Sequence, residues 1–564
     1  MEDQAQGAAA SSPQIDRRRA LGLGAALAGV AGAAASLADN AVAAPAPTSQ
    51  VTTDASTIVE TRSGKVGGYR HAGIATFKGI PYAASTAGPA RFLRPQPVAA
   101  WTGVRSSRYY GKVCPQPART GWDNDMEAFL MRWDDGQPGE DCLRLNLWTP
   151  EPDAKRRPVM VWLHGGGFTA GSGQELPAYD GESLARKGDL VRVSVNHRLG
   201  PLGFLDMSAA GPQFAQSANV GMLDLVAALQ WVRDNIAAFG GDPGNVTIFG
   251  QSGGGSKVTT LMGMPSAEGL FHKAIVQSGS IKLTATPEDN RRAFRAILSE
   301  FELSEATAQR LQQVPAAELV TRSGRALAIA SGGGGSGLPP GVGGRPRLGW
   351  SPSVDGALLP EAPFTNGAPA MAAKIPMIIG NTKDEWGLNY ARDQADMTQA
   401  QLVANLTPIF GARTDSVIAA FRSEFPGLSP AQAMGTIVSM PMRNNALDQV
   451  AQKHRQGGAP VYSYWFRWET PVLGGMPRAF HCSDLPHCFA NAERCATTTG
   501  DTPEAREVSS RMSQAWINFA RTGNPSQPGL AWAPYDPATV ATMVFDTHSR
   551  MENDPASAAR KSVL

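Results

Sequence analysis

The sequence has little of what marks proteins that bind nucleic acids or metals. Its 51 Lys and Arg residues nearly balance 49 Asp and Glu, which leaves a formal net charge of +2. No cluster of basic residues is interleaved with aromatic residues, so nothing indicates a nucleic-acid partner. The chain has only five cysteines, and their spacing fits no zinc pattern. We therefore expect no nucleic acid, no metal and no cofactor.

Internal repeats and polar linkers are also missing. A length of 564 residues suggests several domains. However, strand-like and helix-like segments alternate without a linker, which favours one large α/β domain over residues 45–564. We expect helical insertions at about 287–360 and 398–457. The Gly-rich stretch at 331–344 inside the first insertion is typical of a mobile loop.

The N-terminus has the pattern of a signal peptide. Three arginines at 17–19 precede a stretch rich in Gly, Ala and Leu at 20–38, and Ala41-Val42-Ala43 is a small-residue cleavage pattern. This predicts a twin-arginine signal peptide over 1–44, cleaved near Ala43 or Ala44. The stretch is long enough to span a bilayer, but its many Gly and Ala residues weaken insertion. We expect export to the periplasm or the extracellular space, with no stable membrane anchor.

The segment 246–254 predicts a nucleophile. A β-branched and aromatic run from Val246 to Phe249 ends in the pattern Gly-x-Ser-x-Gly at 250–254. Helical spacing of apolar residues precedes it at 221–236, so the order is that of an α/β unit. A sharp turn from strand to helix forces its central serine into a strained conformation and exposes the hydroxyl. Ser252 is therefore predicted to attack carbonyl carbons in an acyl-transfer reaction.

A second glycine-rich turn predicts an oxyanion hole. The apolar strand 157–163 continues directly into His164-Gly165-Gly166-Gly167-Phe168. Consecutive glycines let backbone N–H groups converge on one point without obstruction by side chains. Such donors stabilise the charge that develops on a carbonyl oxygen during nucleophilic attack.

A serine nucleophile needs a base, and four histidines follow the turn at 250–254. His454 lies in a polar helical stretch and His548 in a polar tail, where a solvated position is expected. His481 follows the strong strand 461–468 and a Gly/Pro loop, which is where this type of fold presents its base. We predict His481 as the base, with His487 as the alternative.

The acid that orients the base is expected between the serine and the histidine. The apolar strand 375–380 leads into Asp384 and Glu385. Both follow the carboxyl end of a strand, where sites gather in open α/β sheets. Spacing alone does not choose between them.

Motifs along nearly the whole chain after residue 55 resemble the type-B carboxylesterases. These α/β-hydrolases include bacterial para-nitrobenzyl esterases, mammalian carboxylesterases and cholinesterases. The resemblance implies a large, mostly parallel central sheet with helices on both faces and helical cap insertions. The matching segments are 77–83, 91–95, 140–146, 164–168, 196–200, 231–236, 239–243, 277–280 and 383–385.

The resemblance implies a role for each site residue. Residue by residue, it implies Ser252 as nucleophile, Glu385 as acid, His481 as base, the amides of Gly166, Gly167 and Gly253 as oxyanion donors, and Ser278 as a support of the acid. It also implies structural ion pairs between Arg91 and Glu140 and between Arg198 and Asp242.

Three departures from the family pattern surround these residues. Gln251 stands before the serine where the family usually has Glu, and Gly253 follows it where the family usually has Ala. The loss of a carboxylate at 251 implies a different polar network around the site. Trp386 separates Glu385 from Gly387, but leaves the acid in place.

The cysteines and two aromatic residues complete the expectations. Cys114 and Cys142 match the family's first disulfide, and Cys488 with Cys495 would form a local second bridge, because export permits disulfides. Cys482 would then stay unpaired beside His481, with no turn around it that would make it a nucleophile. Phe168 and Trp133 are candidates for apolar walls of the substrate pocket, and each fits a core position equally well.

Taken together, the sequence predicts a secreted serine carboxylesterase that acts on a small-molecule ester. The same residues would also serve amide, carbamate or thioester hydrolysis, because those reactions differ in leaving-group protonation and in pocket shape. A non-catalytic binding protein of this fold is the remaining alternative, but such proteins lose the nucleophile. Oligomeric state and physiological substrate stay open.

Overall fold

The computed structural model describes residues 50–117, 125–280, 284–332 and 348–564. The predicted signal peptide and most of the Gly-rich stretch at 331–344 lie outside the described residues. The large unit from Pro47 to Leu564 contains all of the elements discussed below.

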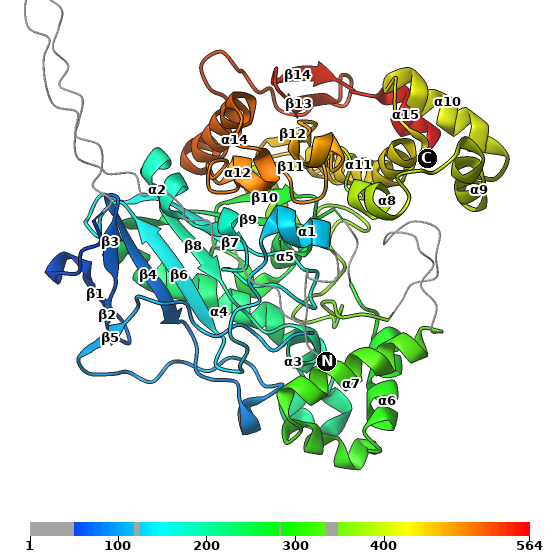
Figure 1. Ribbon diagram of the computed structural model, residues 1–564. Coiled ribbons are helices and arrows are strands. Elements are labelled where there is room, and N and C mark those ends of the chain that lie inside the picture. Colours follow the sequence, from blue (N-terminus) through cyan, green and yellow to red (C-terminus); the bar gives the residue numbers. More distant parts are fainter. Residues whose placement is uncertain (1–49, 118–124, 281–283, 333–347) are drawn as a thin grey trace, which may run out of the picture. The chain divides into compact units, whose positions relative to one another are not determined.

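A central sheet of eleven strands runs through the described residues (Figure 1). Its central strands run parallel to one another, from β8 through β7, β9, β10, β11 and β12 to β13. Antiparallel strands flank them at both ends. The predicted large, mostly parallel sheet is thereby confirmed. In spatial order the strands are β14 (Arg550–Asn553), β13 (Ala541–Phe545), β12 (Val461–Phe466), β11 (Met377–Thr382), β10 (Lys273–Gln277), β9 (Gly241–Gln251), β7 (Arg157–Leu163), β8 (Val191–Val195), β6 (Arg144–Thr149), β4 (Ile74–Pro81) and β3 (Tyr69–His71).

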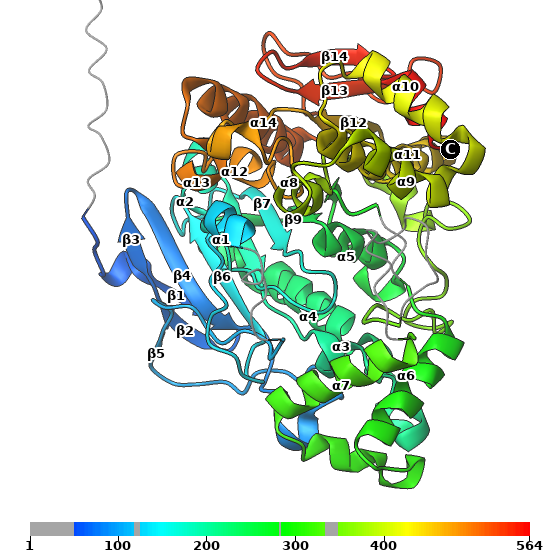
Figure 2. The ribbon, with the colours of Figure 1, turned by 45° about the vertical axis from the view of Figure 1, so that its right-hand side comes forward.

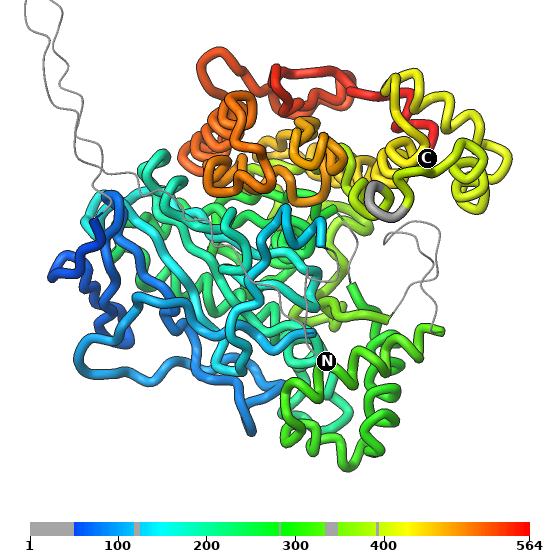
Figure 3. The backbone as a smooth tube through the Cα atoms, in the orientation of Figure 1, coloured from blue at the N-terminus to red at the C-terminus, as the bar shows by residue number. Residues whose placement is uncertain are grey.

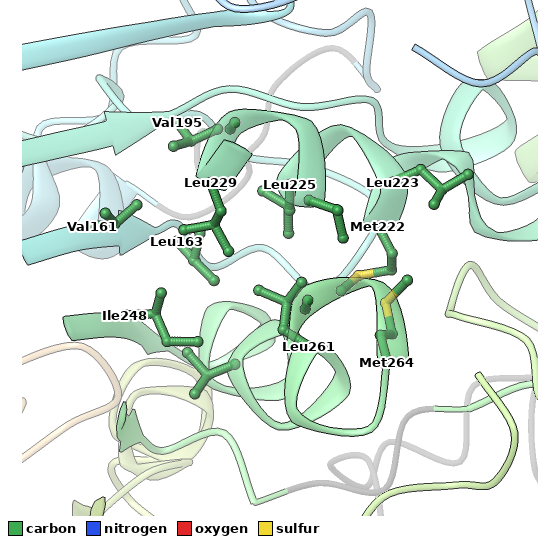
Figure 4. Close-up of a cluster of buried hydrophobic side chains, with 14 of the residues drawn as sticks. Val161, Leu163, Val195, Met222, Leu223, Leu225, Leu229, Ile248, Leu261 and Met264 are labelled. Atoms are coloured by element: carbon green, nitrogen blue, oxygen red, sulfur yellow. The ribbon is translucent and has the colours of Figure 1, made fainter. Parts of the chain in front are cut away.

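The central strands are apolar on both faces because both faces are covered. All seven residues of β7 are buried. Val161 and Leu163 point into one hydrophobic cluster, whereas Met160 and Trp162 point into a second cluster on the other face. Successive side chains of a strand point to opposite faces of the sheet, which divides the residues of β7 between the two clusters. Figure 4 shows part of the first cluster, in which Leu261 lies near Ile248 of the sheet.

Helices cover the two faces as predicted. The first cluster contains side chains from α4 (Val220–Asn235), α5 (Gly253–Met262) and α11 (Pro430–Gln456). The second contains side chains from α2 (Glu182–Gly188), α12 (Leu485–Cys488) and α14 (Pro503–Thr522). Shorter helices lie in the connections: α1 (Asp125–Met131), α3 (Gly200–Phe204), α8 (Gly387–Asp393), α13 (Ala496–Thr499) and α15 (Ser557–Ser562).

The two regions predicted as insertions are helical. The first contains α6 (Pro287–Glu300) and α7 (Ala316–Ala330), which pack against each other (Figure 2). The second contains α9 (Gln399–Phe410), α10 (Thr414–Glu424) and the start of α11, which share a third hydrophobic cluster with Ala559 of the C-terminal helix α15. In Figure 3, the yellow backbone of this region lies beside the C-terminus. Thr286, Thr398 and Ser429 begin α6, α9 and α11 with capping boxes, which satisfy the free N–H groups of the first turn.

The described residues also form a second, small sheet of three strands. It contains β1 (Ile58–Thr61), β2 (Gly64–Gly67) and β5 (Val104–Ser106), in which β1 and β2 form an antiparallel hairpin.

One of the two expected structural ion pairs was assigned wrongly. Arg91 does contact Glu140, with a nitrogen-to-oxygen distance of 2.6 Å. Arg198, however, pairs with Asp224 of α4 at 2.7 Å, and both side chains are fully buried. Asp242 instead contacts the exposed Arg156 at the edge of the sheet. A buried guanidinium needs a partner that is buried with it, and Asp224 meets that condition whereas Asp242 does not.

Candidate active site

Ser252 occupies the strained turn that the sequence predicts. β9 ends at Gln251, α5 begins at Gly253, and Ser252 between them has φ 57° and ψ −127°. A non-glycine residue in this region costs on the order of 1–3 kcal/mol, so its surroundings must hold it there. The Ser252 N–H donates to the Gln277 carbonyl at 2.8 Å, and the Ser256 N–H donates to the Ser252 carbonyl at 3.1 Å. The Ser252 side chain remains partly accessible.

The glycine-rich loop after β7 packs directly against this turn. Gly166 and Gly167 have φ values of 78° and 63°, which favour glycine. A Cβ atom added to Gly253 would lie 2.5 Å from the Gly167 nitrogen and 2.3 Å from its oxygen. The backbones at 167 and 253 are therefore in close contact beside Ser252. This proximity explains why Gly replaces the usual Ala at 253, since the space for a methyl group is filled by the loop.

Gly253→Ala tests this packing. The added methyl group must displace the Gly167 backbone, and a misplacement near 1 Å at a reacting centre costs about 100-fold in rate. We expect kcat to fall roughly 10- to 100-fold. Gly324→Ala in α7 is the matched control, because a Cβ there meets nothing within 4 Å. Steady-state kinetics on both variants check the prediction, and an unchanged kcat in Gly253→Ala would contradict it.

The acid loop and the base loop are joined through their main chains. Asp384, after β11, forms an isolated parallel bridge with Phe480, and its N–H donates to the Ala479 carbonyl at 3.0 Å. The bridge therefore brings the next residue of each loop, Glu385 and His481, close to each other. The carboxylate of Glu385 is hydrogen-bonded to Nδ1 of His481.

The surroundings distinguish the two candidate acids. Glu385 is buried, and its second oxygen accepts the Thr382 N–H at 2.9 Å. Asp384 faces elsewhere: it accepts the Thr436 hydroxyl at 2.6 Å and the Arg478 guanidinium at 3.3 Å. The structure thus places Glu385, and not Asp384, against the histidine.

His481 has an environment suited to a base that becomes charged. Burial lowers the pKa of its imidazole, but Cys482 and Glu385 raise that pKa more strongly, so that it lies well above its usual value. Trp386 stacks on the ring, with centroids 5.6 Å apart and planes 17° apart. The extra tryptophan in this chain therefore forms one side of the histidine site.

Gln251 contributes a contact that the sequence did not predict. Its side-chain nitrogen lies 3.1 Å from Nε2 of His481, the nitrogen opposite Glu385. Within the described residues, the Ser252 hydroxyl has no hydrogen bond to His481. Hydrogen bonds of this kind often form only when substrate binds. The amide of Gln251, the residue before Ser252, therefore contacts the imidazole, with its nitrogen also 3.4 Å from Nδ1.

The other histidines lie in different environments. His487 is fully buried beside the rings of Phe466 and Trp468, and burial lowers its pKa to about 3. His454 lies on α11 against Tyr535, and His548 is exposed. The structure brings none of these three to Glu385.

Three further predicted residues have no established role in the site. Ser278 has φ 48°, and its buried hydroxyl lacks a partner among the described residues. Phe168 is 1% exposed and packs edge-on against Phe204, which is a core position. Trp133 is half-buried and packs against the second hydrophobic cluster.

The cysteines do not form the expected disulfides. All five lie within the described residues and are free thiols. The Cys142 thiol is hydrogen-bonded to Cys114, so this pair is adjacent but not bonded covalently. The Cys488 sulfur instead contacts Gln277 at 3.6 Å and the Leu485 carbonyl at 3.4 Å, beneath the sheet. Its side chain is thus engaged away from Cys495.

Sequence reasoning also missed two buried ionisable residues around the site. Asp484 accepts hydrogen bonds from Gln277 and Tyr464, both at 3.0 Å, and burial raises its pKa to about 6. Lys257 lies five residues after Ser252 and is fully buried. A lysine in a helix whose other residues are small or apolar is the signal that could have indicated it.

The described residues hold no group of three or more His, Cys, Asp or Glu side chains that could bind a metal ion. Among the same residues, no helix is both long and apolar enough to cross a membrane.

Comparisons with known proteins identify the family and the fold. The model of the carboxylesterase family matches residues 55–561. The para-nitrobenzyl esterase of Bacillus subtilis is 37% identical over 510 residues, which are 90% of this chain and 98% of that protein. A solved esterase of Clostridium hathewayi, which can hydrolyse aliphatic aromatic polyesters, superimposes with a TM-score of 0.78 at 37% identity and covers 91% of this chain and 99% of its own. A carboxylesterase structure from Geobacillus stearothermophilus has a TM-score of 0.75 at 36% identity and covers 90% of this chain and 100% of its own. The chain therefore belongs to the carboxylesterase family and is a carboxylic ester hydrolase of type B.

Proposed function

We propose that this protein hydrolyses carboxylic esters through an acyl-enzyme on Ser252, with His481 as base and acid and Glu385 as the orienting carboxylate. The observation that carries the proposal is the hydrogen bond between Glu385 and His481 at the end of the sheet where Ser252 occupies a strained turn. The contact of Gln251, the residue before Ser252, with the same imidazole supports the proposal.

In the acylation step, His481 takes the proton of Ser252 while the hydroxyl oxygen attacks the ester carbonyl. Glu385 holds Nδ1 of the imidazole, so that Nε2 faces the serine and the imidazolium that forms is stabilised. Amides of Gly166, Gly167 and Gly253 donate to the developing oxyanion. His481 then protonates the leaving alcohol.

Deacylation repeats these steps with water. His481 takes a proton from water, and the resulting hydroxide attacks the acyl carbon, after which Ser252 regains its proton as the acid product leaves. In both acylation and deacylation, His481 first takes a proton and then donates it. The raised pKa of His481 supports the donation, because the imidazolium must keep the proton until it is delivered.

The proposed substrates are small carboxylic esters. Para-nitrobenzyl esters are the first choice, because a relative that aligns over nearly its full length is a para-nitrobenzyl esterase. Amides, carbamates and thioesters are the competing classes, and no contact in the site favours them.

Export belongs to the same proposal. It is supported by the arginines at 17–19, the Gly/Ala/Leu stretch that follows and the small residues at 41–43. N-terminal sequencing of the mature protein tests it, and a protein that begins at Met1 would contradict cleavage.

A fluorophosphonate probe combined with an ester panel tests the catalytic proposal. We expect the probe to modify the peptide that contains Ser252 and to stop hydrolysis in proportion to labelling. Turnover across esters of varied acyl length and alcohol bulk should exceed turnover of the matched amides. Full labelling without loss of hydrolysis, or labelling at another residue, would overturn the mechanism.

A further inference from the structure

The side chain of Lys257 lies buried beneath the glycine-rich loop. It is 0% exposed, in the second turn of α5. Taking an ammonium out of water costs several kcal/mol unless partners replace the water. The Nζ atom donates to the His164 carbonyl at 2.8 Å and lies 3.5 Å from the Gly165 carbonyl. Both carbonyls belong to the loop that holds Gly166 and Gly167.

The Gly165 carbonyl and the Gly166 N–H belong to one peptide group. The described residues contain no cis peptide, and in a trans peptide the C=O and N–H bonds point in opposite directions. Nδ1 of His164 also lies 3.0 Å from the Gly165 carbonyl. Groups that hold this carbonyl on one side of the loop therefore direct the Gly166 N–H to the other side.

Burial lowers the pKa of Lys257 to about 7 although the nearby Glu175 raises it, so the ammonium form is populated near neutral pH. Burial and the charge of Lys257 hold the pKa values of His164 and His197 well below their usual range, so both rings stay neutral. Glu175 is buried too, and burial raises the pKa of its carboxyl group to about 8, although one of its oxygens accepts the Ser172 N–H at 3.0 Å. A cation beside a peptide carbonyl polarises the peptide, which makes the opposite N–H a stronger donor.

We propose that Lys257 is a positioning residue, which fixes and polarises the peptide that presents the Gly166 amide to the oxyanion formed at Ser252. This inference rests on the proposed function. The oxyanion exists only in the transition state and the tetrahedral intermediates, so Lys257 affects kcat and leaves the affinity for the ester largely unchanged.

Lys257→Met tests the proposal with a side chain of similar length and no charge. We expect kcat to fall 10- to 100-fold while KM changes less than threefold. The affinity for a reversible aryl trifluoromethyl ketone, which forms a tetrahedral adduct on serine, should fall in proportion to kcat/KM. Lys257→Gln keeps a donor without the charge and should give an intermediate loss.

Lys453→Met is the matched control. Lys453 is also buried, and its ammonium donates to the Ala459 carbonyl at 2.6 Å and the Gly457 carbonyl at 3.3 Å, at the far end of α11. Its loss should lower stability but not kcat per folded molecule. Equal losses of kcat in both lysine variants, or wild-type ketone affinity in Lys257→Met, would overturn the inference.

Glu175→Gln covers the case in which Lys257→Met does not fold. This change keeps Lys257 and removes the carboxylate that favours its charge, so kcat should fall with little change in KM. An unchanged kcat in both Glu175→Gln and Lys257→Gln would overturn the inference. Failure of the proposed function looks different: Ser252→Ala would keep hydrolysing esters, or the wild-type protein would hydrolyse none.

Discussion

Ser252→Ala is expected to lower kcat for ester hydrolysis by at least about 10⁴-fold, because it removes the oxygen that would form the acyl-enzyme. The substitution removes one oxygen that has no hydrogen bond to His481, so the fold and the substrate affinity should stay near wild type. Measured kcat and thermal unfolding of the same preparation check both parts.

The neighbouring Ser256 provides the control for this substitution. Ser256 lies in α5, and its hydroxyl donates to the Gly279 carbonyl at 3.0 Å. Ser256→Ala should therefore cost about 1 kcal/mol of stability. Its kcat should remain near wild type. Residual turnover of Ser252→Ala above about 1% of wild type would show that the hydroxyl at 252 is not the nucleophile.

Glu385→Gln is expected to lower kcat by roughly 10³- to 10⁴-fold. The amide keeps the shape of the side chain but can hold the imidazole in the wrong tautomer, and it removes the charge that stabilises the imidazolium. KM should change little, since Glu385 is buried behind His481 and does not reach the substrate. Steady-state kinetics, with circular dichroism to verify folding, provide the measurement.

Asp384→Asn separates the two carboxylates that spacing could not separate. Asp384 lies among Thr436, Arg478 and Lys383, so its loss leaves a buried guanidinium short of a partner and should cost about 3 kcal/mol. Its kcat per folded molecule should be close to wild type. The opposite pattern, with Asp384→Asn inactive and Glu385→Gln active, would reverse the assignment of the acid.

The sequence predicted the parts of this protein that local patterns control. The apolar run at 157–163 is long enough to identify a strand, and the glycines after it and around Ser252 mark turns that other residues cannot adopt. The helical insertions are equally visible, since Thr398 and Ser429 cap them with side chains at fixed offsets. These features depend on neighbours within a few residues.

Features that depend on distant segments were not predictable in the same way. The choice of Glu385 over Asp384 follows from the bridge to Phe480, which no local pattern indicates. Arg198 was paired by resemblance with Asp242, although its burial requires Asp224. Cys488 and Cys495 are close in sequence, but the Cys488 side chain turns under the sheet.

The main-chain bridge between Asp384 and Phe480 has a consequence for how this protein can evolve. Glu385 and His481 are 96 positions apart, and helices α9 to α11 lie between them. Because both loops leave adjacent parallel strands and are tied together, α9 and α10 can lengthen, shrink or change their outer surface without separating Glu385 from His481, whereas α11 is held to the acid loop through Thr436. New substrate preferences can therefore arise in that stretch by insertion or deletion, while the proton-transfer geometry is inherited unchanged.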